Sequence, residues 1–175
     1  MYSVLIRHPR RSEGERRLFI GQLMTGIFGA LLALVVVFRL SPDALIDRPI
    51  SGFEWWVVTA GFIGGWSATG LARERLGRRG LGNMLLGMGA VTFFAPIIAG
   101  TLGLPLYGTM FGPFTLALIF VASPITALLW AANLVGVHIL FRTWHAERDS
   151  IFGAQMPDPI WRVLWRGARK LVERD

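Results

Sequence analysis

The chain has no cysteine, a single lysine and few charges of either sign. Without cysteine, disulfides and Cys-ligated zinc or iron–sulfur centres are excluded. Only 17% of the 175 residues are charged, whereas soluble domains carry about 25%. The charges are clustered, and 53% of the residues are hydrophobic. This composition predicts one membrane domain and leaves no length for a separate soluble one.

Residues that carry chemistry are also scarce. No carboxylate lies inside the long apolar runs, which argues against an autonomous ion-coupled pump because such pumps usually need one there. The loops hold no Ser/His/Asp set, no paired carboxylates and no His/Glu spacing typical of a metal site. We therefore expect no enzyme activity, no catalytic residue, no metal and no cofactor.

Four apolar runs dominate the sequence, at about residues 18–40, 55–72, 83–103 and 114–141. A helix satisfies all of its backbone amides internally, as hydrocarbon requires, so runs of this length predict transmembrane helices. The fold class expected is an all-α membrane protein with a four-transmembrane-helix bundle. Capping boxes precede the first two runs, pairing Ser12 with Glu15 and Ser51 with Glu54.

The basic residues predict the orientation. Sixteen of the eighteen lie in the N-terminal segment (1–17), the loop after the second run, or the C-terminal segment (142–175), and only Arg39 and Arg48 lie elsewhere. Cytoplasmic segments carry the Lys/Arg excess. Both termini are therefore predicted to be cytoplasmic, on either side of a transmembrane domain at 18–141.

Small residues recur at helical spacing in every run. In lipid, helices associate by close backbone approach rather than by a hydrophobic drive, and small residues permit that approach. The ladders serve either packing within one bundle or docking of a partner helix. The second run has two adjacent small faces, which predicts a central helix. The helix-packing candidates are Gly21, Gly29, Gly61, Gly65, Ala95, Ala99, Ser123 and Ala127.

Tryptophans mark two expected interfacial positions. Trp55 and Trp56 open the second run, where indoles are favoured at the membrane surface. A second pair, Trp161 and Trp165, lies on the apolar face of an expected amphipathic helix at about 159–172. Its other face carries Arg162, Arg166 and Arg169, which suit anionic lipid or an acidic partner.

His138 is an ionisable residue inside the fourth run. It is a candidate ligand for a haem or chlorin or a candidate proton carrier, but a neutral imidazole near the interface also bonds simply to water or backbone. Ser123 and Trp130 belong to a mildly polar stripe on the same run, beside Pro124 and at a depth similar to Pro96. Prolines free carbonyls, which either line a small site or are satisfied by neighbouring helices.

The loop after the second run has a recognisable pattern. Residues 70–79, GLARERLGRR, resemble the cytoplasmic loop motif between the second and third spans of the major facilitator superfamily, with Glu74 where that family has Asp. The resemblance implies a transporter loop whose charges hold two halves together. The same residue types, including Arg75, Arg78 and Arg79, are also typical of any tight cytoplasmic turn.

The expected function is that of a non-enzymatic accessory, structural or assembly subunit of a larger bacterial inner-membrane complex. The alternative is a small oligomeric transporter or channel. Expected partners are membrane lipid, including anionic lipid, and other integral membrane subunits or further copies of the chain. Nucleic acid is not expected, because the arginines flank membrane segments rather than forming one basic aromatic surface.

The C-terminal pattern gives a testable prediction. A peptide of residues 158–175 should bind anionic vesicles and become helical there, with blue-shifted Trp emission, because each basic residue near such a surface contributes about 1 kcal/mol. Changing Arg162, Arg166 and Arg169 to Glu should abolish the preference over neutral vesicles. A peptide that stays unstructured on both vesicle types would contradict the prediction.

Overall fold

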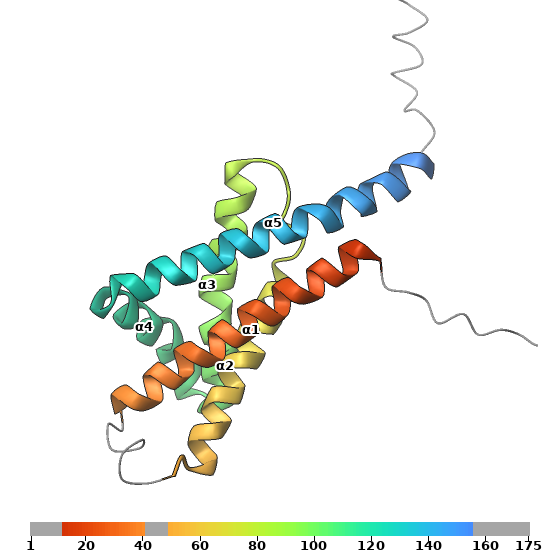
Figure 1. Ribbon diagram of the computed structural model, residues 1–175. Coiled ribbons are helices and arrows are strands. Elements are labelled where there is room, and N and C mark those ends of the chain that lie inside the picture. The colour runs from red at the N-terminus through yellow and green to blue at the C-terminus, as the bar shows by residue number, and fades with distance from the viewer. Residues whose placement is uncertain (1–11, 41–48, 156–175) are drawn as a thin grey trace, which may run out of the picture. The chain divides into compact units, whose positions relative to one another are not determined.

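The computed structural model describes residues 12–40 and 49–155. Five helices follow one another (Figure 1): α1 (Glu13–Leu40), α2 (Gly52–Leu71), α3 (Leu81–Gly103), α4 (Tyr107–Ala122) and α5 (Pro124–Gln155). No strand occurs in the described ranges. Stretches of α1, α3 and α5 are long and apolar enough to cross a membrane. The all-α membrane class is thus confirmed, while the count of four spans stays a prediction.

The first two helices begin at the predicted capping boxes. Glu15 N donates to Ser12 Oγ (3.1 Å), and Ser12 N donates to Glu15 Oε2 (3.2 Å). At α2, Ser51 N donates to Glu54 Oε2 (2.6 Å), and Glu54 N donates to Ser51 Oγ (3.2 Å). Each box satisfies amides that the helix itself leaves without an acceptor. Local sequence therefore determines the residue at which each of these two helices begins.

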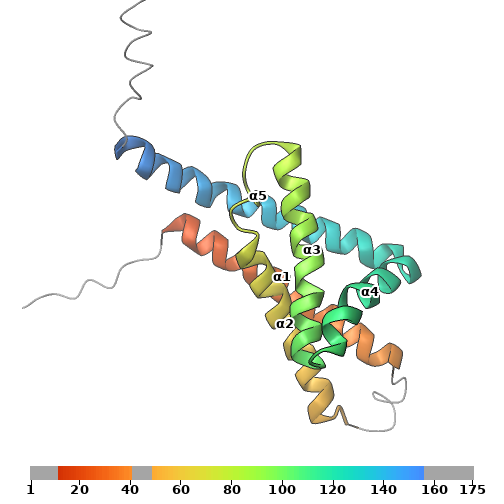
Figure 2. The ribbon, with the colours of Figure 1, turned by 180° about the vertical axis from the view of Figure 1, so that it is seen from behind.

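Helix α2 contacts α1 on one side and α3 on the other (Figure 2). A Cβ on Gly61 would lie 2.6 Å from Gly29 O of α1, so any side chain there would force the two backbones apart. On the other face, a Cβ on Gly64 would lie 2.9 Å from the Ala99 Cβ of α3. Both small faces are consequently used inside the described bundle, and the predicted central position of this helix is confirmed.

The prediction of one continuous helix over residues 114–141 is wrong. The run is divided between α4 and α5, with Ser123 as the C-cap of α4 and Pro124 as the first residue of α5. Proline has no N–H for the carbonyl four residues before it, and its ring is favourable at the first position of a new helix. Pro113, which directly precedes the predicted run, lies inside α4.

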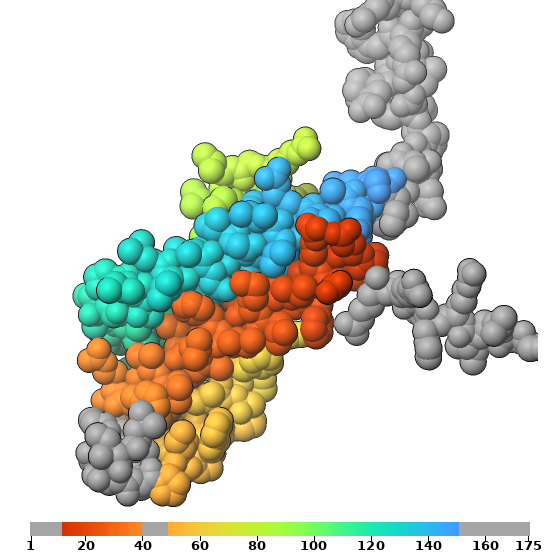
Figure 3. Space-filling view, viewed as in Figure 1, coloured from red at the N-terminus to blue at the C-terminus, as the bar shows by residue number. Residues whose placement is uncertain are grey.

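Helix α5 lies beside α1 on the face shown in Figure 3. Phe28 and Trp130 pack with ring centroids 5.6 Å apart, and a Cβ on Gly21 would lie 2.7 Å from the Phe141 ring. Phe141 is fully buried. The compact unit ends at His145, and within the following unit Ser150 Oγ donates to Glu147 O (2.7 Å). The predicted tail helix with Trp161 and Trp165 lies outside the described residues.

Substitution of the α2 glycines should destabilise the bundle. Gly61→Leu and Gly65→Leu should each lower the midpoint of thermal unfolding in mild detergent, because overpacking costs about 1–3 kcal/mol and both sites face α1 backbone. Gly89→Leu on α3 is the matched control, since a Cβ there meets nothing within 4 Å. Equal effects at all three positions would contradict this packing.

Candidate functional site

The basic loop, residues 72–80, joins α2 to α3 and contains two glycines in the left-handed region. Gly77 has φ +85° and Gly80 has φ +109°. The two differ in their surroundings: a Cβ on Gly77 would lie 2.5 Å from Phe141 C and 2.7 Å from Arg142 N, whereas a Cβ on Gly80 would lie 3.9 Å from Asn83 Nδ2, an ordinary contact. The loop backbone therefore lies directly on α5 at Gly77.

His138 of α5 holds this part of the loop. Its Nδ1 accepts a hydrogen bond from Gly77 N (3.0 Å), so Nδ1 carries no proton and the other ring nitrogen does. The imidazole is 8% exposed. A buried backbone N–H without an acceptor is costly, and His138 provides one that no loop residue supplies. His138, the candidate cofactor ligand, thus accepts a hydrogen bond from the loop backbone through Nδ1.

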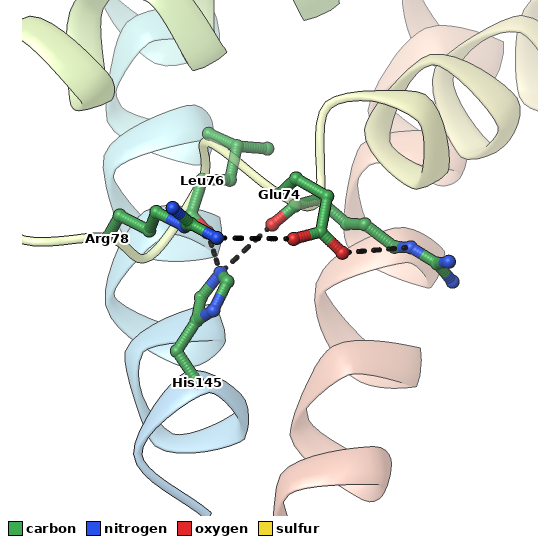
Figure 4. Close-up of polar contacts among 5 residues, drawn as sticks. Glu74, Leu76, Arg78 and His145 are labelled. Carbon is green, nitrogen blue, oxygen red and sulfur yellow. Dashed lines mark hydrogen bonds and ion pairs between the residues drawn. The ribbon is translucent and has the colours of Figure 1, made fainter. Parts of the chain in front are cut away.

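His145, two turns after His138 on α5, contacts the loop residues that precede Gly77. Its Nε2 lies 3.1 Å from Arg73 O and 2.9 Å from Leu76 O, and because both partners are carbonyl oxygens, the ring nitrogen is the donor (Figure 4). Leu76 is fully buried. Gly77, His138, Phe141 and His145 are together called the loop-docking cluster.

The charged side chains of the loop lie outside this cluster. Glu74 forms ion pairs with Arg73 Nε (3.9 Å) and Arg78 Nη2 (3.5 Å), as Figure 4 shows. All three side chains are about half exposed, so these pairs contribute little to stability. Arg75 and Arg79 are exposed. In this structure Glu74 pairs with Arg73 and Arg78, while the loop is positioned through its backbone.

Three basic segments meet at this end of the compact unit. The guanidinium of Arg17 donates to Thr143 Oγ1 (2.9 Å) and pairs with Glu13. This bond joins the start of α1 to the part of α5 that carries Arg142, and His145 joins α5 to the loop. The described members of the three basic segments, with Arg17, the loop arginines and Arg142, therefore lie at the same end.

At the other end of the unit, an apolar groove of about 830 Å³ opens between α1 and α4. Its floor contains the close contacts of α1 with α2 and of α3 with α4, at Gly29, Gly61, Gly100 and Gly108. Because α1 and α4 have no extensive contact of their own, the groove lies between them. Its α4 wall includes Phe111 and Leu118, which are 59% and 53% exposed.

Apart from Thr115 on the α4 wall, the polar residues of the groove lie toward its two ends. Arg39 in the last turn of α1, Ser51 at the N-cap of α2 and Glu54 line one end. Ser123 and Trp130 line the other. Trp130 Nε1 donates to Thr92 Oγ1 of α3 (2.9 Å). The groove thus contains the Ser123 and Trp130 positions of the polar stripe, together with Pro96.

The other predicted site residues have separate places. Trp55 and Trp56 are 58% and 45% exposed at the start of α2, and Trp56 Nε1 donates to Leu102 O of α3 (2.9 Å). Ala95 and Ala99 face α2 and line the groove floor, and Ala127 is half-buried on α5. The tail residues Trp161, Trp165, Arg162, Arg166 and Arg169 lie outside the described residues.

Several important residues were not predicted. Gly77 lies far from Phe141 and His145 in the sequence and contacts α5 only in the folded chain. The seven-residue spacing of His138 and His145 did indicate that both side chains lie on one face of a helix. The groove was not predicted either, since its lining comes from all five helices. Within the described residues, no group of three or more His, Asp or Glu side chains is placed to hold a metal ion.

No protein-family model matches the chain, and no curated protein or solved structure is significantly similar to it. The resemblance of residues 70–79 to a transporter loop therefore stays a local one.

Loss of the His138 acceptor should loosen the loop. His138→Leu leaves Gly77 N–H buried without a partner, a penalty of about 1–3 kcal/mol, and should lower the unfolding midpoint and speed tryptic cleavage at the loop arginines. His138→Asn retains an acceptor at nearly the same place and should recover much of the loss. Equal behaviour of the two variants would show that the hydrogen bond is unimportant.

Proposed function

We propose that the chain is a non-enzymatic accessory subunit, structural or assembly, of a larger bacterial inner-membrane complex. The observation that supports this proposal is the break between α4 and α5 at Ser123 and Pro124. A broken helix inside a bilayer needs protein or water around it, since lipid offers no hydrogen bonds.

The break lies close to the middle of α3. Thr92, which accepts from Trp130, is eleven residues from each end of α3. Pro124 precedes Trp130 by six residues, or about 9 Å of helix rise. The hydrocarbon core extends about 15 Å to either side of its midplane. If α3 crosses the bilayer, the break therefore lies at hydrocarbon depth.

The regular backbone hydrogen bonding of a helix is interrupted at the break. Pro124 has no N–H for the carbonyl of Phe120, and the amides of Thr126 and Ala127 both donate to Ser123 O. The surrounding side chains are apolar and outward-facing: Val121 is 82% exposed and Ile125 is 71% exposed. A helix of another subunit, lying over these side chains, would shield the break from lipid.

The distribution of charge supports the proposed orientation in the membrane. Described residues of the three basic segments, among them Arg17, Arg78 and Arg142, lie at the loop-docking end, which suits a cytoplasmic surface under the positive-inside rule. On this arrangement both termini are cytoplasmic, and α4 with α5 makes the fourth crossing as a broken helix. The membrane is then the bacterial inner membrane.

The alternative, a small oligomeric transporter or channel, is favoured by one observation. The groove reaches the break through Ala122 and Ser123, and irregular backbone is also tolerated where it lines water. Its lining is almost entirely apolar, however, and Glu54 is engaged with Ser51 N at the far end. An accessory role accounts better for such a surface.

Site-specific photocrosslinking tests the proposal. A photoreactive amino acid at Val121 or Ile125, in cells, should link the chain to one recurrent integral membrane protein, identified by mass spectrometry. The control position is Leu85, 65% exposed near the other end of α3. The linked protein should also co-purify from the wild-type strain in mild detergent at constant stoichiometry.

Two other results would argue against an accessory role. Crosslinks only to a second copy of the chain, together with solute movement by the pure protein in liposomes, would favour the oligomeric transporter. Crosslinks only to lipid at Val121 and Ile125 would show that the break needs no protein cover.

A further inference from the structure

The groove between α1 and α4 has the length, lining and charge of a phospholipid site. We propose that it binds one anionic phospholipid, with the phosphate of the headgroup at Arg39 and the acyl chains along the groove toward Ser123. This inference goes beyond the accessory role and does not depend on it.

The first argument is length. The inner end of the groove lies at Trp130, which is bonded to the middle of α3 at Thr92. The outer end is lined by Leu104, the C-cap of α3. The twelve residues from Thr92 to Leu104 rise about 18 Å, which matches one leaflet of about 15 Å and the start of its headgroup region. A transmembrane helix would need about twice that length.

The second argument is the lining. The walls are aliphatic and aromatic, including Val36, Val57, Leu116 and Ile119, and the floor is formed by glycines whose backbones are in contact. The volume of about 830 Å³ falls within the range of about 300–1,000 Å³ typical of small-molecule sites. Such a surface offers dispersion contacts to an acyl chain, and Thr115 is the polar side chain among the described lining residues between the two ends.

The third argument is charge. Within the described part of the chain, the guanidinium of Arg39 has no hydrogen-bond or ion-pair partner. It lies ten residues beyond Gly29 on α1, or about 15 Å further toward the membrane surface. Arg39 therefore stands at headgroup level beside an apolar groove. A guanidinium binds phosphate through paired N–H donors, so the complementary ligand is an amphiphile with an anionic phosphate.

Glu54 lies at the same end and does not reverse this preference. Its carboxylate accepts from Ser51 N at 2.6 Å in the capping box that begins α2, and its side chain is 6% exposed. Arg39 is exposed and is thus the accessible charge among the described residues that line this end of the groove.

Native mass spectrometry of the full chain in a neutral detergent tests the proposal. The probes are phosphatidylglycerol and phosphatidylcholine with identical acyl chains. The wild type should bind one phosphatidylglycerol saturably, with about fivefold preference over phosphatidylcholine, as expected for one basic residue near an anionic headgroup. Arg39→Gln should reduce the preference to near one. Arg75→Gln removes the same charge from the opposite end and should leave the preference unchanged.

A second pair of variants tests the acyl-chain path. Ala122 lines the groove, whereas Ala117 is exposed on α4 and does not. Ala122→Phe should weaken binding of both lipids about tenfold, because the ring takes space that the chain needs. Ala117→Phe adds the same ring to α4 outside the groove and should have no effect. The unfolding midpoint of each variant shows whether it is folded.

Three results would overturn the proposal. Non-saturable binding, equal for both headgroups, would mean that only annular lipid is present. A phosphatidylglycerol preference that survives Arg39→Gln would place the anionic site elsewhere. A loss of self-association in Ala122→Phe, without any change in lipid binding, would mean that a second copy occupies the groove.

Discussion

Close approach of helix backbones at α2 is the constraint on which the rest of the described structure depends. Lipid gives helices no hydrophobic reason to associate, so their attraction comes from dispersion between surfaces that can touch. Gly61 and Gly65 let α1 approach, and Gly64 does the same for α3. The positions of α1 and α3 about this axis in turn decide where α4 and α5 can pack.

The two ends of the compact unit differ in how their polar groups find hydrogen-bond partners. At the loop end, α5 supplies imidazoles to the backbone of the basic loop, with a donor at His145 and an acceptor at His138. Thr25 and Thr69 are fully buried, but each donates to a carbonyl of its own helix. At the groove end, α4 diverges from α1, and apolar side chains remain accessible.

Helix existence and class were predictable because they follow from local sequence. Apolar runs of sufficient length require internal hydrogen bonding in lipid, and the boxes at Ser12 and Ser51 fix two helix starts. The central position of α2 followed from its two small faces. The break at Ser123 was not predicted, since Pro113 and Pro124 each suit a helix start, and only packing against α3 decides between them.

The candidate sites were less predictable than the fold, because their residues are brought together by tertiary contacts. His138 was singled out by its burial in an apolar run, but its partner Gly77 lies 61 positions earlier and is a glycine among many. The positive φ of Gly77 becomes significant only once Phe141 is known to lie against it. The groove likewise depends on five helices whose individual sequences are merely apolar.

The break and the groove express one property of this chain, namely that α4 is too short to complete the bundle. With 16 residues it rises about 24 Å, and it packs on α3 through Gly100, Gly108 and Gly112 rather than on α1. A continuous fourth helix following α3 would have no break, and a longer contact with α1 would close the groove. Two surfaces are thus left uncovered in the described structure, one at Ile125 and one that faces α1 beside Arg39. Since the two surfaces lie on different sides of the α4–α5 junction, a protein neighbour at the first and a lipid at the second are compatible.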